Sequence, residues 1–171
     1  RRQKIQKMTI NLSQLSERAR AAVRSQDWGT VSACANSILQ QDTTNPEGYF
    51  LTGLVERVSG RPVMAAQAFE RALELDERRY DAAIELANQY SIARRNGDAA
   101  DLVARYEDKL ANSSMYLDLA GTVYSEIGMP QKAWPLYKKA NELQPGVDVF
   151  QANLAACGVF LGKIDEAQEI Y

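Results

Sequence analysis

Small residues recur every 34 positions along this 171-residue chain, and this period constrains the fold more than any other feature. One ladder of such residues is Ala19, Gly53, Ala87, Gly121 and Ala155. A second ladder with the same spacing is Val31, Ala65, Ala99, Ala133 and Ala167. The chain therefore divides into repeats of residues 12–45, 46–79, 80–113, 114–147 and an incomplete fifth repeat of residues 148–171. A period of this length is typical of stacked supersecondary units.

Each repeat contains residues that begin and end two short helices. A small residue on the first helix lets the second helix cross closely. Glycine supplies the left-handed backbone that ends a helix, and proline opens the next helix. The residues placed to do so are Gly60, Pro62, Gly128, Pro130 and Gly162. The third repeat has Arg94 at the glycine position and its glycine, Gly97, three residues later, so we expect its first helix to run about one turn longer.

The residues within the repeats resemble those of the tetratricopeptide repeat (TPR) family. The second repeat matches at Tyr49, Gly53, Gly60, Ala65, Phe69 and Ala72. The fourth repeat matches at Leu117, Gly121, Tyr124, Gly128, Ala133, Tyr137, Ala140 and Pro145. The resemblance covers residues 12–171 and implies an all-α fold, a right-handed superhelix of antiparallel helix pairs. We expect this region to be a single domain that follows a basic N-terminal extension of residues 1–11.

The sequence lacks the residues that most enzymes use. Histidine is absent, which removes the commonest general base and the commonest transition-metal ligand. We find no phosphate-binding glycine-rich loop with lysine, no dinucleotide fingerprint and no metal-ligand spacing. Neighbouring carboxylates such as Asp98 and Asp101 are typical of solvated helix faces. We therefore expect no catalytic residue, no cofactor and no metal site in this chain.

The charge distribution argues against a nucleic-acid partner. Four of the 20 basic residues lie in residues 1–11, so residues 12–171 hold 16 basic against 22 acidic residues, a net charge of −6. A nucleic-acid-binding protein normally shows a basic face. No apolar run approaches the roughly 18 residues of a membrane span, and the N-terminal residues lack the apolar stretch of a signal peptide. With only two cysteines, Cys34 and Cys157, we expect no disulfide framework, no membrane partner and a cytoplasmic location.

One surface stripe is the best candidate for a partner site. Positions 2, 5, 9 and 12 of each first helix share one helical face, and stacked repeats align these faces into a concave groove. Phe50, Leu54 and Ile84 are apolar at such positions and are flanked by polar residues, as in a peptide-binding site. Alternatively, Phe50 and Leu54 are covered by residues 1–11 or pack sideways. The predicted groove residues are Arg20, Phe50, Leu54, Arg57, Ile84, Asn88, Ser91, Asp118, Thr122 and Ser125.

Two grooves of the family do not match this sequence. Co-chaperone members grip a carboxylate with lysine and asparagine pairs, and positions such as Phe50 and Leu54 do not carry these residues. Glycosyltransferase members carry a ladder of groove asparagines, to which only Asn88 and Asn153 correspond here. We therefore expect neither a chaperone-tail clamp nor an asparagine ladder.

The function that we expect is a non-catalytic interaction module that binds a peptide or a partner helix in the groove. An alternative is the recognition arm of a larger enzyme, since residues 151–171 resemble the repeat arms of some bacterial sulfotransferases. A further alternative is a structural scaffold that assembles with itself. Because the fifth repeat is short and apolar, we also expect self-association through the C-terminal end.

Overall fold

The structure, a computed structural model, describes residues 11–169, which form two compact units that meet at Leu75 and Asp76 in the sequence. Apart from Asn11, the predicted basic extension lies outside the described residues, as do the last two residues of the fifth repeat. Unit 1 contains α1 (Leu12–Arg24), α2 (Trp28–Gln41), α3 (Pro46–Val58) and α4 (Pro62–Leu75). Unit 2 contains α5 (Tyr80–Ile92), α6 (Asn96–Tyr106), the 3₁₀ helix η1 (Glu107–Lys109), α7 (Ser114–Glu126), α8 (Pro130–Leu143), α9 (Asp148–Phe160) and α10 (Ile164–Gln168).

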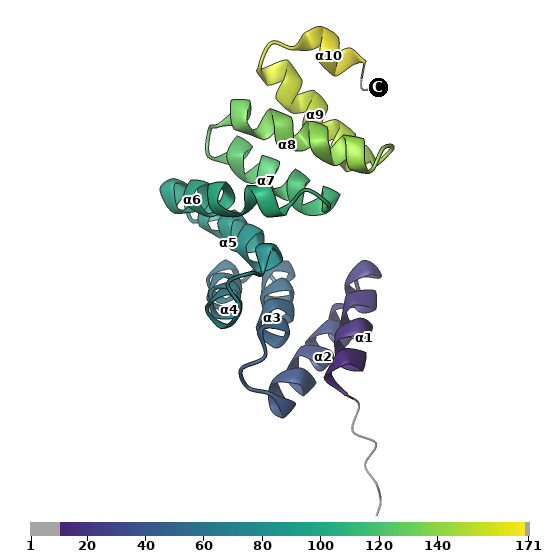
Figure 1. Ribbon diagram of the computed structural model, residues 1–171, viewed down its shortest axis with the longest axis vertical. Helices are drawn as coiled ribbons and strands as arrows, with labels where there is room; N and C mark the ends of the chain where they lie inside the picture. Colours follow the sequence, from purple (N-terminus) through teal and green to yellow (C-terminus); the bar gives the residue numbers. More distant parts are fainter. Residues whose placement is uncertain (1–10, 170–171) are drawn as a thin grey trace, which may run out of the picture. The chain divides into compact units, whose positions relative to one another are not determined.

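The helices pack in consecutive pairs within each unit (Figure 1). In unit 1 each helix packs on the next one in the chain. In unit 2, α5 packs on α6 and α7, α8 lies between α7 and α9, and α10 packs on α9. The first helix of each pair begins at Leu12, Pro46, Tyr80, Ser114 or Asp148, so these starts keep the 34-residue period. The predicted all-α fold built from helix pairs is confirmed.

Side-chain caps define the starts of α1, α2 and α3 in unit 1. Asn11 and Gln14 form a reciprocal capping box, in which Asn11 Oδ1 accepts from the Gln14 amide at 2.8 Å. Asp27 caps α2 by accepting from the Thr30 amide at 3.2 Å. Asn45 caps α3 by accepting from the Glu47 amide at 3.0 Å. These caps satisfy backbone donors that have no partner inside the helix.

The glycines of the first ladder lie where paired helices cross, as the sequence predicts. A Cβ atom added to Gly53 would lie 2.5 Å from the Phe69 ring, and one added to Gly121 would lie 2.8 Å from the Tyr137 ring. Both aromatic side chains are buried. The small residues of the ladder therefore allow the two helices to approach more closely than a larger side chain would permit.

The turns between paired helices share one backbone conformation. Gly60, Gly128 and Gly162 have φ between 73° and 82°, and Gln26 and Arg94, at the equivalent positions, have φ of 58° and 62°. Each turn has the two hydrogen bonds of a Schellman motif, such as Arg94 N to Ser91 O at 3.1 Å and the next amide to Tyr90 O at 2.8 Å. The prediction of a longer first helix in the third repeat is wrong. Because Arg94 adopts the left-handed conformation itself, α5 has 13 residues, as α3 and α7 do.

Candidate functional site

The three apolar residues of the predicted groove are buried and form no exposed patch. The exposed fractions of Phe50, Leu54 and Ile84 are 2%, 4% and 0%. The ring of Phe50 lies 5.9 Å from the ring of Phe69 on α4, and the guanidinium of Arg20 on α1 lies 5.9 Å from its centroid. The prediction of an exposed apolar patch at these three residues is therefore wrong.

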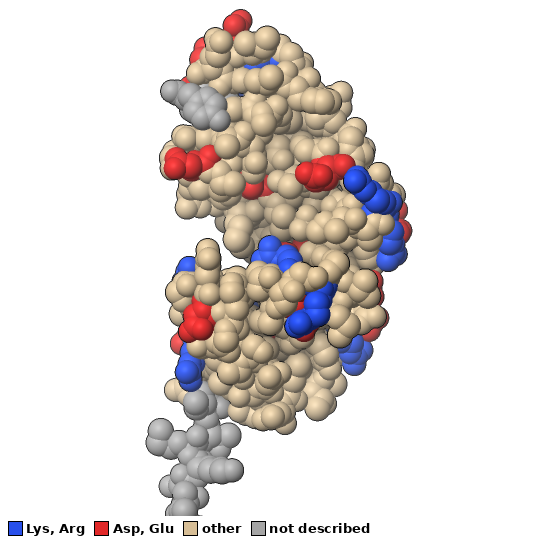
Figure 2. Space-filling view, turned by 180° about the vertical axis from the view of Figure 1, so that it is seen from behind, with Lys and Arg blue, Asp and Glu red and all other residues tan. Residues whose placement is uncertain are grey.

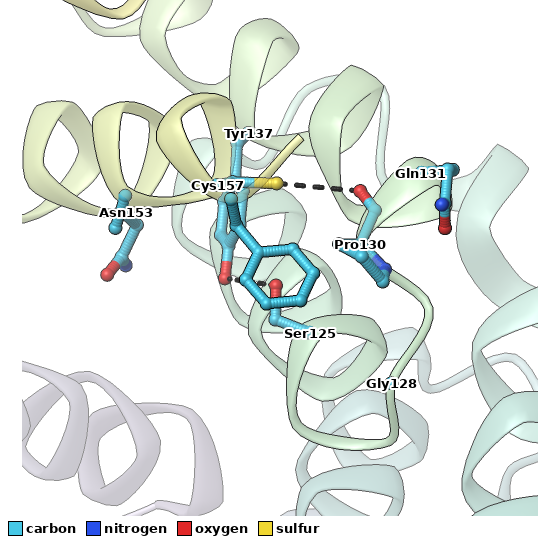
Figure 3. A pocket seen from close by; sticks show the side chains of 9 residues that line it. Ser125, Gly128, Pro130, Gln131, Tyr137, Asn153 and Cys157 are labelled. Carbon is cyan, nitrogen blue, oxygen red and sulfur yellow. Dashed lines mark hydrogen bonds between the residues drawn. The ribbon is translucent and has the colours of Figure 1, made fainter. Parts of the chain in front are cut away.

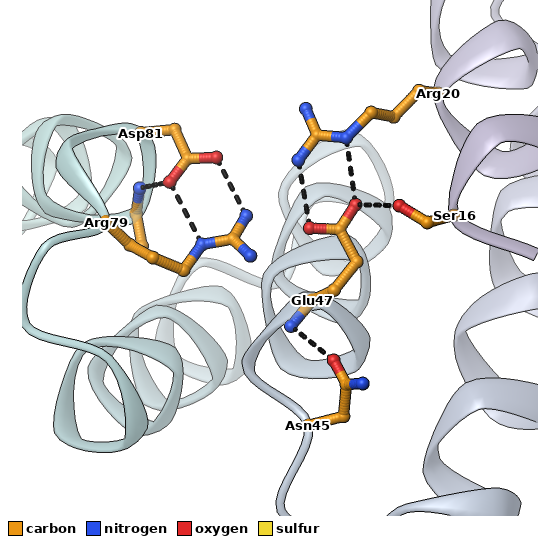
Figure 4. A network of polar contacts seen from close by, with 7 residues as sticks. Ser16, Arg20, Asn45, Glu47, Arg79 and Asp81 are labelled. Carbon is orange, nitrogen blue, oxygen red and sulfur yellow. Dashed lines mark hydrogen bonds and ion pairs between the residues drawn. The ribbon is translucent and has the colours of Figure 1, made fainter. Parts of the chain in front are cut away.

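The polar groove residues of unit 1 join α1 to α3 (Figure 4). Arg20 donates from Nε and Nη2 to the two carboxylate oxygens of Glu47, at 3.0 and 2.9 Å. Ser16 Oγ donates to the same carboxylate at 3.0 Å. Arg57, the other predicted basic groove residue of unit 1, is half-buried on α3. A bidentate pair of this kind fixes the relative position of two helices more firmly than a single contact does.

In unit 2, the start of α5 carries a second bidentate pair (Figure 4). Arg79 donates to the two oxygens of Asp81 at 3.1 and 2.8 Å, and Asp81 also accepts from the Ala82 amide at 2.8 Å. Further along α5, the predicted groove residue Ser91 is buried and donates to the backbone oxygen of Asn88 at 2.7 Å. The hydroxyl of the groove residue Ser91 therefore bonds within its own helix.

Asp118 on α7 is joined to Asn153 on α9. The Asn153 Nδ2 atom donates to both carboxylate oxygens of Asp118, at 3.1 and 3.0 Å. Only 8% of Asp118 is exposed. Burial raises the pKa of the Asp118 carboxyl, and the hydrogen bond from Asn153 offsets part of that rise. Asp118 is thus an acidic group held just inside the surface between two first helices.

A cluster of hydroxyl groups continues this surface along α7. The Tyr137 hydroxyl, which reaches α7 from α8, donates to Thr122 Oγ1 at 3.1 Å and lies 3.3 Å from Ser125 Oγ. Burial raises the pKa of Tyr137, and the hydrogen bonds with Ser125 and Thr122 oppose this rise. Asp118, Thr122 and Ser125 are four and three residues apart, so they share one face of α7, as predicted.

A pocket of about 410 Å³ opens at this point between α7, α8 and α9 (Figure 3). Its lining is Ser125, Gly128, Pro130, Gln131, Tyr137, Asn153, Ala156, Cys157 and Phe160. The Cys157 thiol donates to the backbone oxygen of Pro130 at 3.4 Å, and burial raises its pKa. Cys34, in unit 1, is also a free buried thiol. A pocket of this size with a few polar groups is typical of a site for a small ligand or a side chain.

Exposed apolar residues lie along α9 beside the pocket. Val149, Ala152, Ala156 and Val159 share one face of α9 and are all exposed, Val149 and Val159 by 55% and 60%. Phe160 follows and is 78% exposed. On the side that Figure 2 shows, the surface near the C-terminal end is mostly uncharged. We call the surface made by Asp118, Thr122, Ser125, Val149, Ala152, Asn153, Ala156 and Val159 the α7–α9 face.

The sequence predicted only part of this face. Asp118, Thr122 and Ser125 are predicted groove residues, whereas Tyr137 is predicted only as a match to the repeat pattern. Its ring does pack in the core against Gly121, but its hydroxyl reaches Thr122, which the 34-residue period does not indicate. Among residues 11–169, no group of three or more His, Cys, Asp or Glu side chains is placed to hold a metal ion. In the same part of the chain, no helix combines the length and the apolar character needed to cross a membrane.

Comparison with solved structures identifies the fold. TTC0263, a thermophilic TPR protein of Thermus thermophilus, matches with a TM-score of 0.77 and 16% identity, over 94% of this chain and 88% of that one. Pseudomonas aeruginosa PilF matches with a TM-score of 0.75 and 14% identity, over 94% and 73% of the two chains. YrrB, a TPR protein with an unusual peptide-binding site, matches with a TM-score of 0.62 and 18% identity, over 94% and 82%.

These likenesses show that the chain has the TPR fold, an all-α array of antiparallel helix pairs. No protein-family model matches the sequence, and no curated protein sequence matches it either.

Proposed function

We propose that the chain is a non-catalytic interaction module and that its α7–α9 face binds a peptide segment of a partner protein. The observation that carries this proposal is the pocket of about 410 Å³ beside a row of exposed apolar residues on α9. Exposed apolar area with polar groups at its edge is typical of protein-binding surfaces. The peptide-binding site of YrrB, on a similar fold, supports the same proposal.

The proposed site differs from the sequence prediction in its position. Phe50, Leu54 and Ile84 are buried, so the apolar contacts come from α9 instead. Asp118, Thr122 and Ser125 remain in the proposed site. Arg20 and Glu47 bind each other and stabilise unit 1 in this proposal. The two alternatives from the sequence, an enzyme arm and a self-assembling scaffold, stay predictions.

A peptide-binding experiment tests the proposal. Panning a phage library of short random peptides on the whole chain supplies probes, and fluorescence anisotropy of the synthetic peptides measures their affinity. Ala156 lines the pocket and is exposed, so Ala156→Trp should fill the mouth of the pocket with little change in folding. We expect this variant to weaken peptide binding by about tenfold or more, a loss of about 1.4 kcal/mol.

Ala104→Trp is the matched control, because it adds the same side chain to an exposed position on α6. We expect this variant to bind the peptides as the parent chain does. If the library yields no binding peptide, or if Ala156→Trp binds peptides with the parent affinity, the α7–α9 face is not a peptide site and the proposal is wrong.

A further inference from the structure

The helices of the α7–α9 face carry acidic side chains and no basic ones. Asp118 and Glu126 are the charged residues of α7, and Asp148 is the charged residue of α9. The neighbouring Lys132 and Lys163 lie over the rings of Tyr124 and Trp134, at 5.7 and 5.5 Å, and neither lines the pocket. A surface with one sign of charge attracts partners of the opposite sign and repels those of its own sign.

Asp118 lies directly behind one residue of the pocket wall. Asn153 lines the pocket and donates to both oxygens of Asp118, so the carboxylate lies about one hydrogen bond behind the wall. Among the described residues, no lysine or arginine forms an ion pair with Asp118. An ionised carboxylate accepts about four hydrogen bonds, so one amide group leaves acceptor capacity for a further donor. Burial disfavours the charged form, and a nearby cation favours it.

The other end of the face offers an apolar cavity. Ser125 and Phe160 lie at the C-terminal ends of α7 and α9, and both line the pocket. Phe160 and Val159 leave large apolar area exposed at this end. Large apolar or aromatic side chains that enter such pockets provide most of the affinity at many protein interfaces.

The distance between the two ends sets the spacing of the partner residues. Asp118 and Ser125 are seven residues apart on α7, which corresponds to about 10.5 Å along the helix axis. A peptide in the extended polyproline II conformation advances about 3.1 Å per residue and turns every third side chain to the same side. The two contact residues of a segment that reaches both ends therefore lie about three residues apart, at positions i and i+3.

We infer that the partner is an extended peptide in the polyproline II conformation, with a large apolar side chain in the pocket and a lysine or arginine, about three residues away, against Asp118 and Asn153. This inference rests on the proposed function and names the chemistry of the segment that binds. It selects cationic and apolar segments over acidic ones, because α7 and α9 carry only acidic charges.

The phage-selected peptides test this inference. We expect a lysine or arginine about three residues from a large apolar residue in most of the peptides whose binding Ala156→Trp weakens. For one such peptide, the change from lysine to glutamine should weaken binding to the parent chain by about tenfold. The same change should matter little for the Asp118→Asn variant, because the coupled charge is already absent.

Asp101→Asn is the control for net charge, since Asp101 is exposed on α6 and outside the face. This variant should keep the parent preference for lysine. Circular dichroism of Asp118→Asn checks that the helices are retained.

If Ala156→Trp weakens binding of peptides that show no preference for a basic residue, the inference is wrong and the proposed function stands. If no peptide binds at the face, the proposed function itself is wrong. Selection of peptides that resemble a segment of this chain and lack the cationic and apolar pair would also overturn the inference.

Discussion

The matching faces of α3 and α9 differ in where their large side chains lie. On α3, positions 5 and 9 of the repeat are Phe50 and Leu54, and both are buried. On α9 the same positions are Ala152 and Ala156, and both are exposed. The flanking positions 2 and 12 are charged on α3 and are valines on α9.

This comparison shows that side-chain size at two repeat positions decides whether the face is filled or hollow. A phenylalanine at position 5 reaches the aromatic side chain of α4 and becomes part of the core. An alanine at position 9 leaves space beside it, and the pocket opens there in unit 2. Apolar residues at positions 2 and 12 then remain in contact with solvent. In the proposed function, the hollow face is the α7–α9 face, which is available to a partner, and the filled face is the matching face of α3, which is not.

Phe50→Ala tests the filled face and should have the largest effect on stability. Removal of a buried phenylalanine ring leaves a cavity beside Phe69, and we expect a loss of about 3 to 5 kcal/mol in the free energy of unfolding. Val149→Ala on the hollow face should change this free energy by less than about 0.5 kcal/mol. Urea unfolding followed by circular dichroism measures both values. Equal effects would contradict the contrast between the two faces.

Gly121→Ala tests how the core supports the hollow face. The added Cβ atom would lie 2.8 Å from the Tyr137 ring, so we expect a loss of about 1 to 3 kcal/mol in stability. A shift of this ring also moves the hydroxyl away from Thr122 and should weaken peptide binding. Gly97→Ala is the control, because nothing lies within 4 Å of its added Cβ atom. This control should gain about 0.5 to 1 kcal/mol. A Gly121→Ala variant as stable as the parent would show that the helix crossing has room for a methyl group.

Asp118→Asn tests the charge of the hollow face through its pH dependence. Because the pKa of Asp118 is raised in the folded state, the folded chain binds a proton there more tightly than the unfolded chain. This contribution to stability is full below the unfolded pKa of 3.8 and is lost as the pH rises through the folded value. We therefore expect Asp118→Asn to melt at a slightly higher temperature than the parent at pH 7, and the difference to disappear below pH 3.8. A variant that is less stable than the parent at pH 7 would show that the ionised Asp118 carboxylate stabilises the folded state.

Phe160→Ser should have the smallest effect on stability. The side chain is 78% exposed, so its removal should change the free energy of unfolding by less than about 0.5 kcal/mol. We propose that this exposed ring contributes to self-association through the C-terminal end, as the sequence predicts. Sedimentation velocity of the two chains should then show less association for the variant. Identical sedimentation at all concentrations would contradict a role of Phe160 in association.

The fold was predictable from the sequence because its main signal is steric. A residue at the helix crossing has to be small, so Gly53 and Gly121 mark the crossings in the sequence itself. The helix starts follow from the same period. The length of α5 was predicted wrongly because a left-handed arginine has no signature in the sequence. Repetition of the turn in the other repeats was the available signal, and it would have placed Arg94 correctly.

The candidate site was less predictable, because exposure depends on neighbouring helices. Helical periodicity places Asp118, Thr122 and Ser125 on one face, and the structure agrees. The same periodicity places Phe50 on the matching face of α3, but it does not tell whether the Phe69 ring packs against the Phe50 ring. Tyr137 has both a core role and a surface role, and a pattern of residue sizes describes only the first.

The shared conformation of the interhelix turns makes this chain convenient for spectroscopic labelling. Gln26 and Arg94 are exposed residues that adopt the left-handed conformation without glycine, so other side chains are compatible with these turns. The two native thiols are buried, which favours reaction of a maleimide dye with a cysteine introduced at either position. Since Gln26 belongs to unit 1 and Arg94 to unit 2, a donor and acceptor dye at these two turns would report changes in the separation of the units when a peptide binds.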